Sequence, residues 1–275
     1  MRTFTISLAL TVLAIPVVSQ VFTQTCSNPK FPSGSAAAID ASCRPSGSAD
    51  PQSADGLQNI AKNNFCASTP ASPTVTIASL RDLQTKANAA EKKLKFKPGQ
   101  PPPRRDFLMA LGEGDLVTFE GFVFEARQEC KESVNCDTQS PNQDGFHDIH
   151  ISFLDHAPTS KSGSASAQAA EECGSFVGET IPHHRPLEWN ACNMNDVANR
   201  NLRVRVTGQR MFDGSHLTCN GSTPNGSNPK RATLWEIHPI YTFDVCLSGD
   251  CKNGGWVPLE TFAAGKTTCD NKPCN

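Results

Sequence analysis

Two strand-like stretches, each interrupted by a glycine, constrain the fold of this chain more than any other feature of its sequence. Residues 201–213 (NLRVRVTGQRMFD) alternate between apolar and polar side chains up to Gly208. Residues 114–129 (GDLVTFEGFVFEARQE) are apolar on both faces around Gly121. A glycine inside a strand is typical of a sharp bend, and a strand that is apolar on both faces suits both halves of a closed barrel. The two stretches therefore predict a barrel of bent strands.

The order of the remaining elements predicts which barrel this is. Further strand patterns lie at 146–155, 175–181 and 233–246. A helix that begins at Pro186 precedes the strand at 201–213. Three strands, a helix and two more strands is the order of an OB-fold, a five-stranded, partly open Greek-key barrel. We therefore predict a mainly β fold in which residues 106–246 form an OB-like barrel.

The final strand, TLWEIHPIYTFDVC (233–246), carries a proline in its middle. Pro239 has no N–H to donate to a strand ladder, so we expect it at an edge or a bulge. The side chains expected to fill the barrel core from this strand are Trp235, Ile237, Tyr241, Phe243 and Val245.

The region before the barrel, residues 20–105, is predicted to be helical and to contain cysteines. One helix is capped by Ser53, and a second, amphipathic helix starts at Ser79 and runs to Leu94. The prolines at 101–103 end the region as a Pro-rich linker.

Three other segments are rich in turn-forming or small residues. The segment 157–170 is expected to be a flexible loop. The loop before the last strand carries two N-x-S sequons, at Asn220 and Asn225, which matter only if the host glycosylates. Residues 247–275 are expected to form a Cys-rich tail.

The N-terminal residues 1–19 have the three parts of a secretory signal peptide. Arg2 supplies the positive charge, an apolar stretch follows, and the small residues at 17–19 suit cleavage. A lipid anchor at Cys26 is the alternative, but the residues before this cysteine are not small. No later stretch approaches the roughly 18 apolar residues of a membrane span. We predict a secreted or periplasmic protein.

The cysteines support the same compartment. All 12 follow the signal: Cys26, Cys43, Cys66, Cys130, Cys136, Cys173, Cys192, Cys219, Cys246, Cys251, Cys269 and Cys274. No C-x-x-C metal motif occurs, so an even number of cysteines predicts disulfides. Short loops suggest the pairs Cys130–Cys136, Cys246–Cys251 and Cys269–Cys274.

A combination of short motifs resembles a group of uncharacterised exported bacterial proteins. It spans roughly residues 53–260, and its most specific part is V-T-G followed by E-I-H-P. The stretches that carry it are NNFCAS, VRVTGQRMFD, LWEIHP and CLSGDCKNGGWVPL. The resemblance implies an OB-like barrel and export, and it implies no activity or catalytic residue.

An OB-fold usually binds its ligand across the second and third strands and their loops. This surface would present Asp148 and His150 from one strand and His183, His184 and Arg185 from the loop after the next. These five residues are the ligand-binding candidates, and the ligand would be a small molecule, a polysaccharide or a protein.

A divalent metal ion is the alternative ligand. Asp148 and His150, like Glu236 and His238, are two apart on a strand and share one side, so each pair can converge on an ion. We favour a structural role for Glu236 and His238, in which the imidazole bonds a backbone carbonyl left unpaired at Pro239. The prediction is therefore no cofactor, with a metal at Asp148, His150, Glu236 and His238 as the alternative.

Nucleic acid is a further candidate partner, which the charge pattern does not favour. The net charge of −2 gives no general attraction to a polyanion. Locally, Arg203, Arg205 and Arg210 form a basic row on one strand, and 92–105 is a second basic stretch. Binding of a single strand would require these two groups to share one continuous face.

The preferred function is a non-catalytic exported binding protein. A metal-dependent hydrolase or nuclease that uses Asp148, His150, Glu236 and His238 is the alternative, and single-strand nucleic-acid binding is the third candidate. A serine hydrolase is disfavoured because no serine lies in a G-x-S-x-G context. The metal alternative gains if its four side chains meet in one place.

Overall fold

The computed structural model describes most of the chain after the predicted signal peptide. The described residues are 39, 42–67, 73–137, 146–226, 228–248, 251–252 and 254–266. The predicted signal peptide at 1–19 and the expected Cys269–Cys274 pair lie outside them. The described residues include the whole predicted barrel region except 138–145 and 227.

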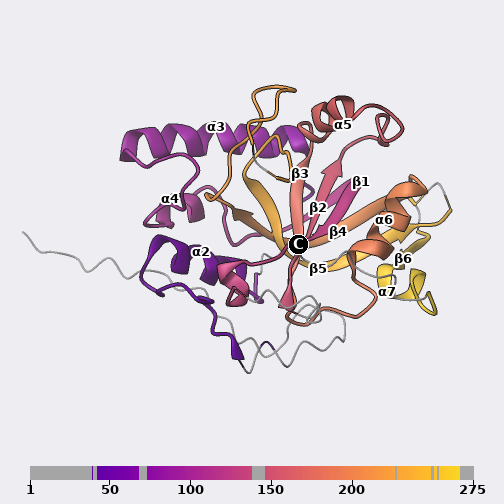
Figure 1. Ribbon diagram of the computed structural model, residues 1–275, viewed down its shortest axis with the longest axis horizontal. Coiled ribbons are helices and arrows are strands. Elements are labelled where there is room, and N and C mark those ends of the chain that lie inside the picture. The colour runs from indigo at the N-terminus through magenta and orange to yellow at the C-terminus, as the bar shows by residue number, and fades with distance from the viewer. Residues whose placement is uncertain are drawn as a thin grey trace, which may run out of the picture.

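Strands gather at the centre of the described structure and helices surround them (Figure 1). The strands are β1 (Leu116–Gln128), β2 (Ile149–Leu154), β3 (Phe176–Thr180), β4 (Arg203–Phe212), β5 (Trp235–Cys246) and β6 (Trp256–Pro258). The helices are α2 (Ala54–Lys62), α3 (Ile77–Leu94), α4 (Asp106–Met109), α5 (Ala165–Glu172), α6 (Ala191–Asn199) and α7 (Leu259–Phe262), and η1 (Ser133–Asn135) is a 3₁₀ turn.

The first five strands close into a mixed barrel, and β6 lies outside it. Antiparallel ladders join β3 to β2, β2 to β1, β1 to β4 and β4 to β5. A parallel pairing of Gly178 with Ile237 then links β3 to β5 and completes the ring. Strand β6 pairs with β5. The predicted barrel of bent strands that closes on itself is confirmed.

Gly121 and Gly208 lie where neighbouring strands approach too closely for a side chain. A Cβ atom at Gly121 would be 2.3 Å from the carbonyl oxygen of Leu154, and one at Gly208 would be 2.3 Å from that of Pro239. Both separations are shorter than real Cβ contacts allow. The two glycines that predicted the bends therefore also permit the close approach of β1 to β2 and of β4 to β5.

Pro239 interrupts the ladder between β4 and β5. The register shifts on both sides of Gly208, which pairs with Ile240. The expected irregularity at Pro239 is therefore confirmed. Because the shift changes which side chains face inward, Ile240 joins the main hydrophobic cluster, whereas Tyr241 packs in a separate small cluster with Ala67. The prediction that Tyr241 fills the barrel core is wrong for this reason.

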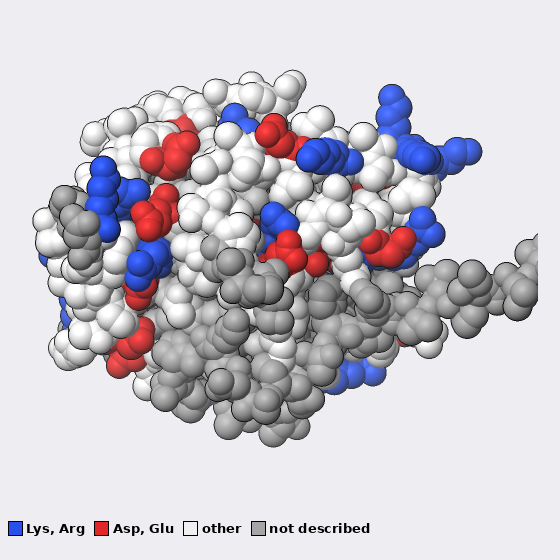
Figure 2. Space-filling model, turned by 180° about the vertical axis from the view of Figure 1, so that it is seen from behind, with Lys and Arg blue, Asp and Glu red and all other residues white. Residues whose placement is uncertain are grey.

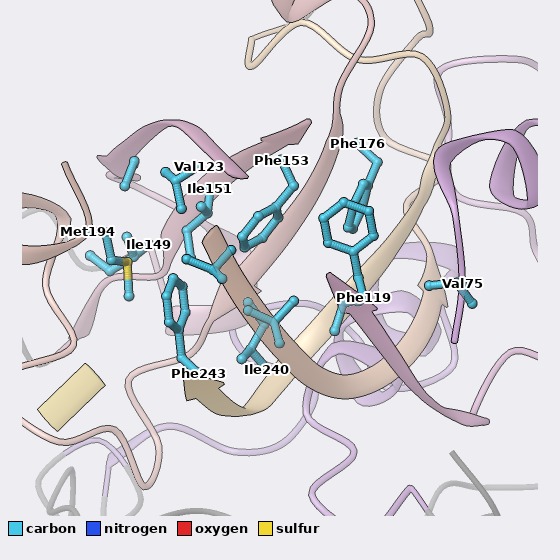
Figure 3. Close-up of a cluster of buried hydrophobic side chains, with 14 of the residues drawn as sticks. Val75, Phe119, Val123, Ile149, Ile151, Phe153, Phe176, Met194, Ile240 and Phe243 are labelled. Carbon is cyan, nitrogen blue, oxygen red and sulfur yellow. The ribbon is translucent and has the colours of Figure 1, made fainter. Parts of the chain in front are cut away.

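A single hydrophobic cluster fills the barrel and continues into the surrounding helices. Phe119, Phe153 and Phe176, from β1, β2 and β3, point toward one another with ring centroids 4.7–5.9 Å apart (Figure 3). Aromatic pairs at such distances add stability beyond the area that they bury. Leu80 and Ala87 of α3 belong to the same cluster. The helical N-terminal region and the barrel therefore share one core.

Helices α2 and α3 begin at capping side chains. Ser53 Oγ accepts a hydrogen bond from the backbone N–H of Gly56 at 3.0 Å, so the predicted cap of α2 is confirmed. Helix α3 starts slightly earlier than predicted, because Thr76 caps it and Ser79 completes a capping box instead of opening the helix.

The segment 157–170 is not a flexible loop throughout, because helix α5 starts within it. Ser164 caps this helix, and an alanine-rich sequence has a high helix propensity. The Glu171 carboxylate accepts hydrogen bonds from the backbone N–H groups of Thr159 and Ser160 at 2.8 and 2.7 Å. These bonds attach the preceding turn to the helix.

Disulfides attach the outer segments to this framework. They join Cys43 to Cys136, Cys173 to Cys219 and Cys246 to Cys251. The predicted Cys246–Cys251 pair is confirmed. The predicted Cys130–Cys136 pair is wrong, because Cys136 bonds to Cys43, 93 residues away in the chain. None of the described cysteines is free.

The C-terminal tail contributes secondary structure to the fold. Strand β6 extends the sheet beside β5, and Leu259 of α7 is buried in the main cluster. The indole N–H of Trp189 donates a hydrogen bond to Glu260 at 2.9 Å. Of the helices in the described ranges, none combines the length and the apolar character that crossing a bilayer requires.

Candidate functional site

The side of β2 that faces away from the barrel core carries the candidate site, and other segments bury it. Ile149 and Ile151 belong to the core cluster, so His150 between them points outward as predicted. However, His150 is only 2% exposed and the preceding Asp148 is fully buried. Helix α2 and the turn at η1 supply side chains over this face. The predicted ligand surface is therefore covered at these two residues.

Nine side chains meet on this outer face, and we name them the buried polar cluster. They are Lys62, Glu132, Asp148, His150, Glu179, Asp213, Arg231, Glu236 and His238. Strands β2, β3 and β5 supply the floor, and the end of α2 and the residue before η1 supply the cover. The barrel thus unites residues that are far apart in the sequence.

Glu179, near the end of β3, is the centre of the cluster. Its Oε1 atom lies 3.0 Å from Nε2 of His150, and its Oε2 atom lies 2.8 Å from Nδ1 of His238. The Lys62 Nζ atom is 3.7 Å from Oε2. Burial alone would raise the pKa of Glu179, but the two histidines and Lys62 hold that pKa well below its ordinary value. Glu179 is therefore a buried carboxylate between three nitrogen groups.

Arg231 joins the β5 side of the cluster to the start of the β4–β5 loop. Its guanidinium contacts Glu236, and Nη1 lies 3.4 Å from Oδ2 of Asp213. The same Asp213 oxygen contacts Nδ1 of His216, whose side chain is 24% exposed. Burial would raise the pKa of Asp213, but His216, Lys62 and Arg231 hold it well below its ordinary value. This arm of the cluster reaches toward the surface.

Lys62 and Glu132 form the cover. Lys62 Nζ lies 3.4 Å from Oε1 of Glu132, which in turn lies 3.6 Å from Nε2 of His150. Burial would raise the pKa of Glu132, yet Lys62 and His150 lower it to about 2. The end of α2 is held in place by Gln209 of β4, whose side-chain amide donates to the carbonyl of Ala61 at 2.8 Å.

The cluster contains more acids than permanent cations. Its five carboxyl groups face one lysine and one arginine, so full ionisation with neutral histidines would leave a net charge of 2 − 5 = −3. Burying uncompensated charge is very costly, so protons or a bound cation must balance it. Burial opposes charge on His238, but Glu179 raises its pKa to about 9. Burial and Glu132 raise the pKa of Asp148 to about 8.

Asp148 is the cluster member whose environment is least complete. Its side chain is fully buried, and within the described part of the chain neither carboxyl oxygen has a hydrogen-bond partner. Buried polar atoms in native proteins nearly always have a partner, because an unpaired one costs about 1–3 kcal/mol. The carboxyl group of Asp148 therefore lacks a ligand or donor that the described side chains do not supply.

Three sets of acids and histidines among the described residues are close enough to share a cation. They are Glu132, His150 and Glu179; Asp148, Glu179 and His238; and Glu179, Asp213 and Glu236. In each set, one candidate ligand atom per residue lies within 4.8 Å of the others. Ligand atoms about 2.0–2.2 Å from one zinc ion lie at most about 4.4 Å apart, so small side-chain rotations would close a set. Glu179 belongs to all three.

The four residues predicted as the alternative metal ligands meet here. Asp148 and His150 from the β2 segment and Glu236 and His238 from β5 all lie around Glu179. The imidazole of His238 was predicted to bond a backbone carbonyl, but its Nδ1 atom instead faces the carboxylates of Glu179 and Glu236. The backbone carbonyl of His238 accepts a hydrogen bond from the side-chain amide of Gln209 at 2.6 Å. The histidine therefore bridges acids at the place where Pro239 interrupts the ladder.

The remaining ligand candidates lie in the loop after β3. The rings of His183 and His184 pack against Phe65, with centroids 5.1 and 5.3 Å away. The Arg185 guanidinium donates a hydrogen bond to the carbonyl of Thr180 at 3.0 Å. These contacts connect the loop to the segment after α2 and to the end of β3.

The predicted basic row is offset by acids. Arg203 lies 3.2 Å from Glu120, Arg205 lies 2.8 Å from Asp244, and Arg210 lies 2.6 Å from Asp115. Figure 2 likewise shows basic and acidic side chains next to each other on the face that it presents. Arg105, from the second basic stretch, is buried against Glu113. These four arginines therefore do not form an open basic surface.

Sequence reasoning did not single out the centre of the site. Glu179 lies in the short strand pattern SFVGETI, where it shares a face with Val177 and opposes Phe176. An acid within a short, otherwise uncharged strand pattern was the available signal. Lys62, Glu132, Asp213 and Arg231 have no such pattern, because they lie at the end of a helix or between elements, in ordinary polar segments.

Comparison with protein-family models, with curated proteins and with solved structures gave no significant match to this chain.

Proposed function

We propose that this chain is an exported binding protein that holds a divalent metal ion in the buried polar cluster, with Asp148, Glu179 and His238 as the ligands. We further propose that its barrel is OB-like. The parallel β3–β5 pairing and the position of α6 between β3 and β4 support this assignment. The signal-like residues 1–19 and the disulfides support export.

The observation that carries the proposal is the unpartnered carboxyl group of Asp148. It is fully buried, it faces Glu179 and His238 within 4.8 Å, and neither oxygen has a hydrogen-bond partner among the described residues. A buried ion-pair network that served only to hold α2 on the barrel would not require the Asp148 carboxyl group, because this group bonds to no described residue. A cation supplies the missing partner and can take the place of the protons that otherwise balance the five acids.

The donor atoms favour some metals over others. An imidazole nitrogen with two carboxylate oxygens suits Zn²⁺ and other first-row transition ions, whereas Ca²⁺ and Mg²⁺ prefer oxygen ligands alone. His150 supports the site from behind Glu179. Its Nε2 atom contacts Oε1 of Glu179, whereas His238 contacts Oε2. Such second contacts orient the ligands of a metal site.

Metal content of matched variants tests the proposal. Asp148→Asn keeps the shape of the side chain and removes the carboxylate, and Asp82→Asn makes the same change at an exposed position on α3. After incubation with Zn²⁺ or Mn²⁺ and removal of the excess, we expect about one ion per chain in the parent and in Asp82→Asn. We expect affinity in Asp148→Asn to fall at least about 100-fold, since even residues behind the ligands contribute 10–100-fold.

Elemental analysis gives the stoichiometry, and isothermal titration calorimetry gives the affinity. A parent protein that takes up neither ion, or an Asp148→Asn variant that binds as well as the parent, would contradict the proposal.

Metal-dependent hydrolysis is the second candidate, and the Asp213–His216 pair favours it. A partly exposed imidazole with one nitrogen held by a buried carboxylate is the arrangement of a general base. The test is hydrolysis of bis(4-nitrophenyl) phosphate by the metal-loaded protein. We expect His216→Asn to lower the rate about 10²–10⁴-fold if His216 is the base. If the metal-loaded parent is inactive, hydrolysis is contradicted and metal binding remains the proposed function.

A further inference from the structure

A cavity lies between helix α3 and the loop that joins β4 to β5. Its volume is about 440 Å³, within the range of small-molecule sites. Helix α3 crosses the outside of the barrel here (Figure 1), and the loop faces it from the other side. The lining residues used below are Gln84, Asn88, Glu91, Lys92, Phe96 and Leu217. None of these residues belongs to the buried polar cluster, so this cavity is a separate site.

Glu91 is the acidic group among the described residues that line this cavity. Its side chain lines the cavity while the residue is only 7% exposed, and no hydrogen bond or ion pair connects its carboxyl group to the described residues. Burial raises its pKa. Its carboxyl group is therefore available to accept a hydrogen bond from a ligand in the cavity.

Asn88 offers the complementary group one turn earlier on the same helix. The side-chain amide of Gln84 donates to Asn88 Oδ1 at 2.6 Å, and the Gln84 oxygen accepts from the backbone N–H of Leu234 at 2.6 Å. Gln84 is therefore occupied in holding the loop and in orienting Asn88. The Nδ2 group of Asn88 keeps its donors for a ligand, three residues before the acceptor of Glu91.

The charge and shape of the cavity decide between ligand classes. Lys92 lines the same cavity as Glu91, so the described lining carries one ionisable group of each sign and does not select a cation or an anion. Phe96 and Leu217 add an aromatic ring and an aliphatic surface. The cavity thus combines hydrogen-bond donors and acceptors with an apolar surface, and its charged groups are one acid and one base.

We propose that this cavity binds a neutral saccharide unit. A sugar hydroxyl can donate to the Glu91 carboxylate while its neighbour accepts from the Asn88 amide, because every hydroxyl is both donor and acceptor. The C–H face of the sugar ring then packs against Phe96. This inference does not depend on the proposed metal site.

Titrations with neutral and charged sugars test the proposal. The probes are the methyl glycosides of glucose, mannose and galactose, N-acetylglucosamine, and the charged sugars glucosamine and glucuronate, monitored by ¹H–¹⁵N chemical shifts of the full mature chain. We expect at least one neutral sugar to bind with a dissociation constant in the millimolar range and to shift signals of α3 and of the loop at 214–218. The charged sugars should bind more weakly.

Two matched variants identify the site. Glu91→Gln keeps the size of the side chain and should weaken binding about tenfold, which is the effect of one hydrogen bond to a charged group. Glu188→Gln makes the same change outside the cavity and should bind like the parent. Metal content should be unchanged in both variants, so a failure here is distinguishable from a failure of the metal site. The proposal is overturned if no neutral sugar saturates, if glucosamine binds best, or if a folded Glu91→Gln variant binds like the parent.

Discussion

A carboxyl group that is buried without a hydrogen-bond donor holds its proton more tightly than one in water. Asp148 is such a group, and burial together with Glu132 raises its pKa to about 8. Its pKa in the unfolded chain is about 3.9. The folded protein therefore gains stability from the protonated acid below about pH 4, and loses this contribution as the pH rises through about 8.

This loss of stability at high pH leads to a prediction for the metal-free protein. Asparagine resembles the protonated acid and cannot ionise, so Asp148→Asn should be more stable than the parent at pH 8.5, by at least about 1.4 kcal/mol, the equivalent of one pKa unit, because the parent must ionise a buried carboxyl group. At pH 5 the two proteins should differ much less. Urea unfolding with a chelator present measures both values, and parallel pH profiles for variant and parent would show that Asp148 is not the group responsible. The same substitution should thus stabilise the metal-free protein while it removes metal binding.

At the scale of elements, the linker before β1 is anchored by one buried ion pair. Arg105 contacts Glu113 through two nitrogens, and it donates to the carbonyl of Phe212 at 2.5 Å. Glu113 in turn accepts from the backbone N–H of Phe212 at 3.0 Å, and Gln58 of α2 lies 3.4 Å from the guanidinium. This pair joins α2, the linker and the end of β4.

The neighbouring arginine provides a control for this anchor. Arg105→Ala should lower the free energy of unfolding by about 3–5 kcal/mol, because it leaves Glu113 buried and unpaired. Arg104→Ala removes only an ion pair with Asp106 in which both side chains are 57% exposed, and it should change stability by about 0.5 kcal/mol or less. Thermal or urea unfolding compares the two variants. Equal losses would mean that the Arg105–Glu113 pair is not the anchor.

At the scale of the whole molecule, the N-terminal region completes the barrel in two places. Leu80 and Ala87 of α3 extend the core, and Lys62 of α2 covers the outer face. The Cys43–Cys136 disulfide connects this region to the turn at η1. The buried polar cluster consequently exists only where the barrel and its N-terminal cover meet.

At the same scale, the described arginines of the two predicted basic groups are paired with acids. A single-strand binding groove needs a continuous positive surface with exposed aromatic rings. Arg203, Arg205 and Arg210 instead face Glu120, Asp244 and Asp115. The 92–105 stretch loses Arg105 to a buried pair. Arg104 of the same stretch pairs with Asp106.

Local chemistry made several features readable from the sequence. Alternating side chains located the strands, and Gly121 and Gly208 indicated bends, because strand periodicity and the steric effect of a missing side chain act over a few residues. The Ser53 cap and the Cys246–Cys251 bond, only five residues apart, are equally local. Such features depend on neighbours in the chain, which the sequence displays directly.

Other features depended on where the barrel closed. The register shift at Pro239 exchanged Tyr241 for Ile240 in the core, and the Cys43–Cys136 bond crosses 93 residues. Sequence analysis proposed Asp148 and His238 as members of one site, yet it missed Glu179 between them. Their meeting is a consequence of the β3–β5 pairing, which no local pattern encodes. The sequence by itself determined the strands and their bends, whereas only the tertiary structure decided which charged groups share a buried centre, because that requires contacts between segments far apart in the chain.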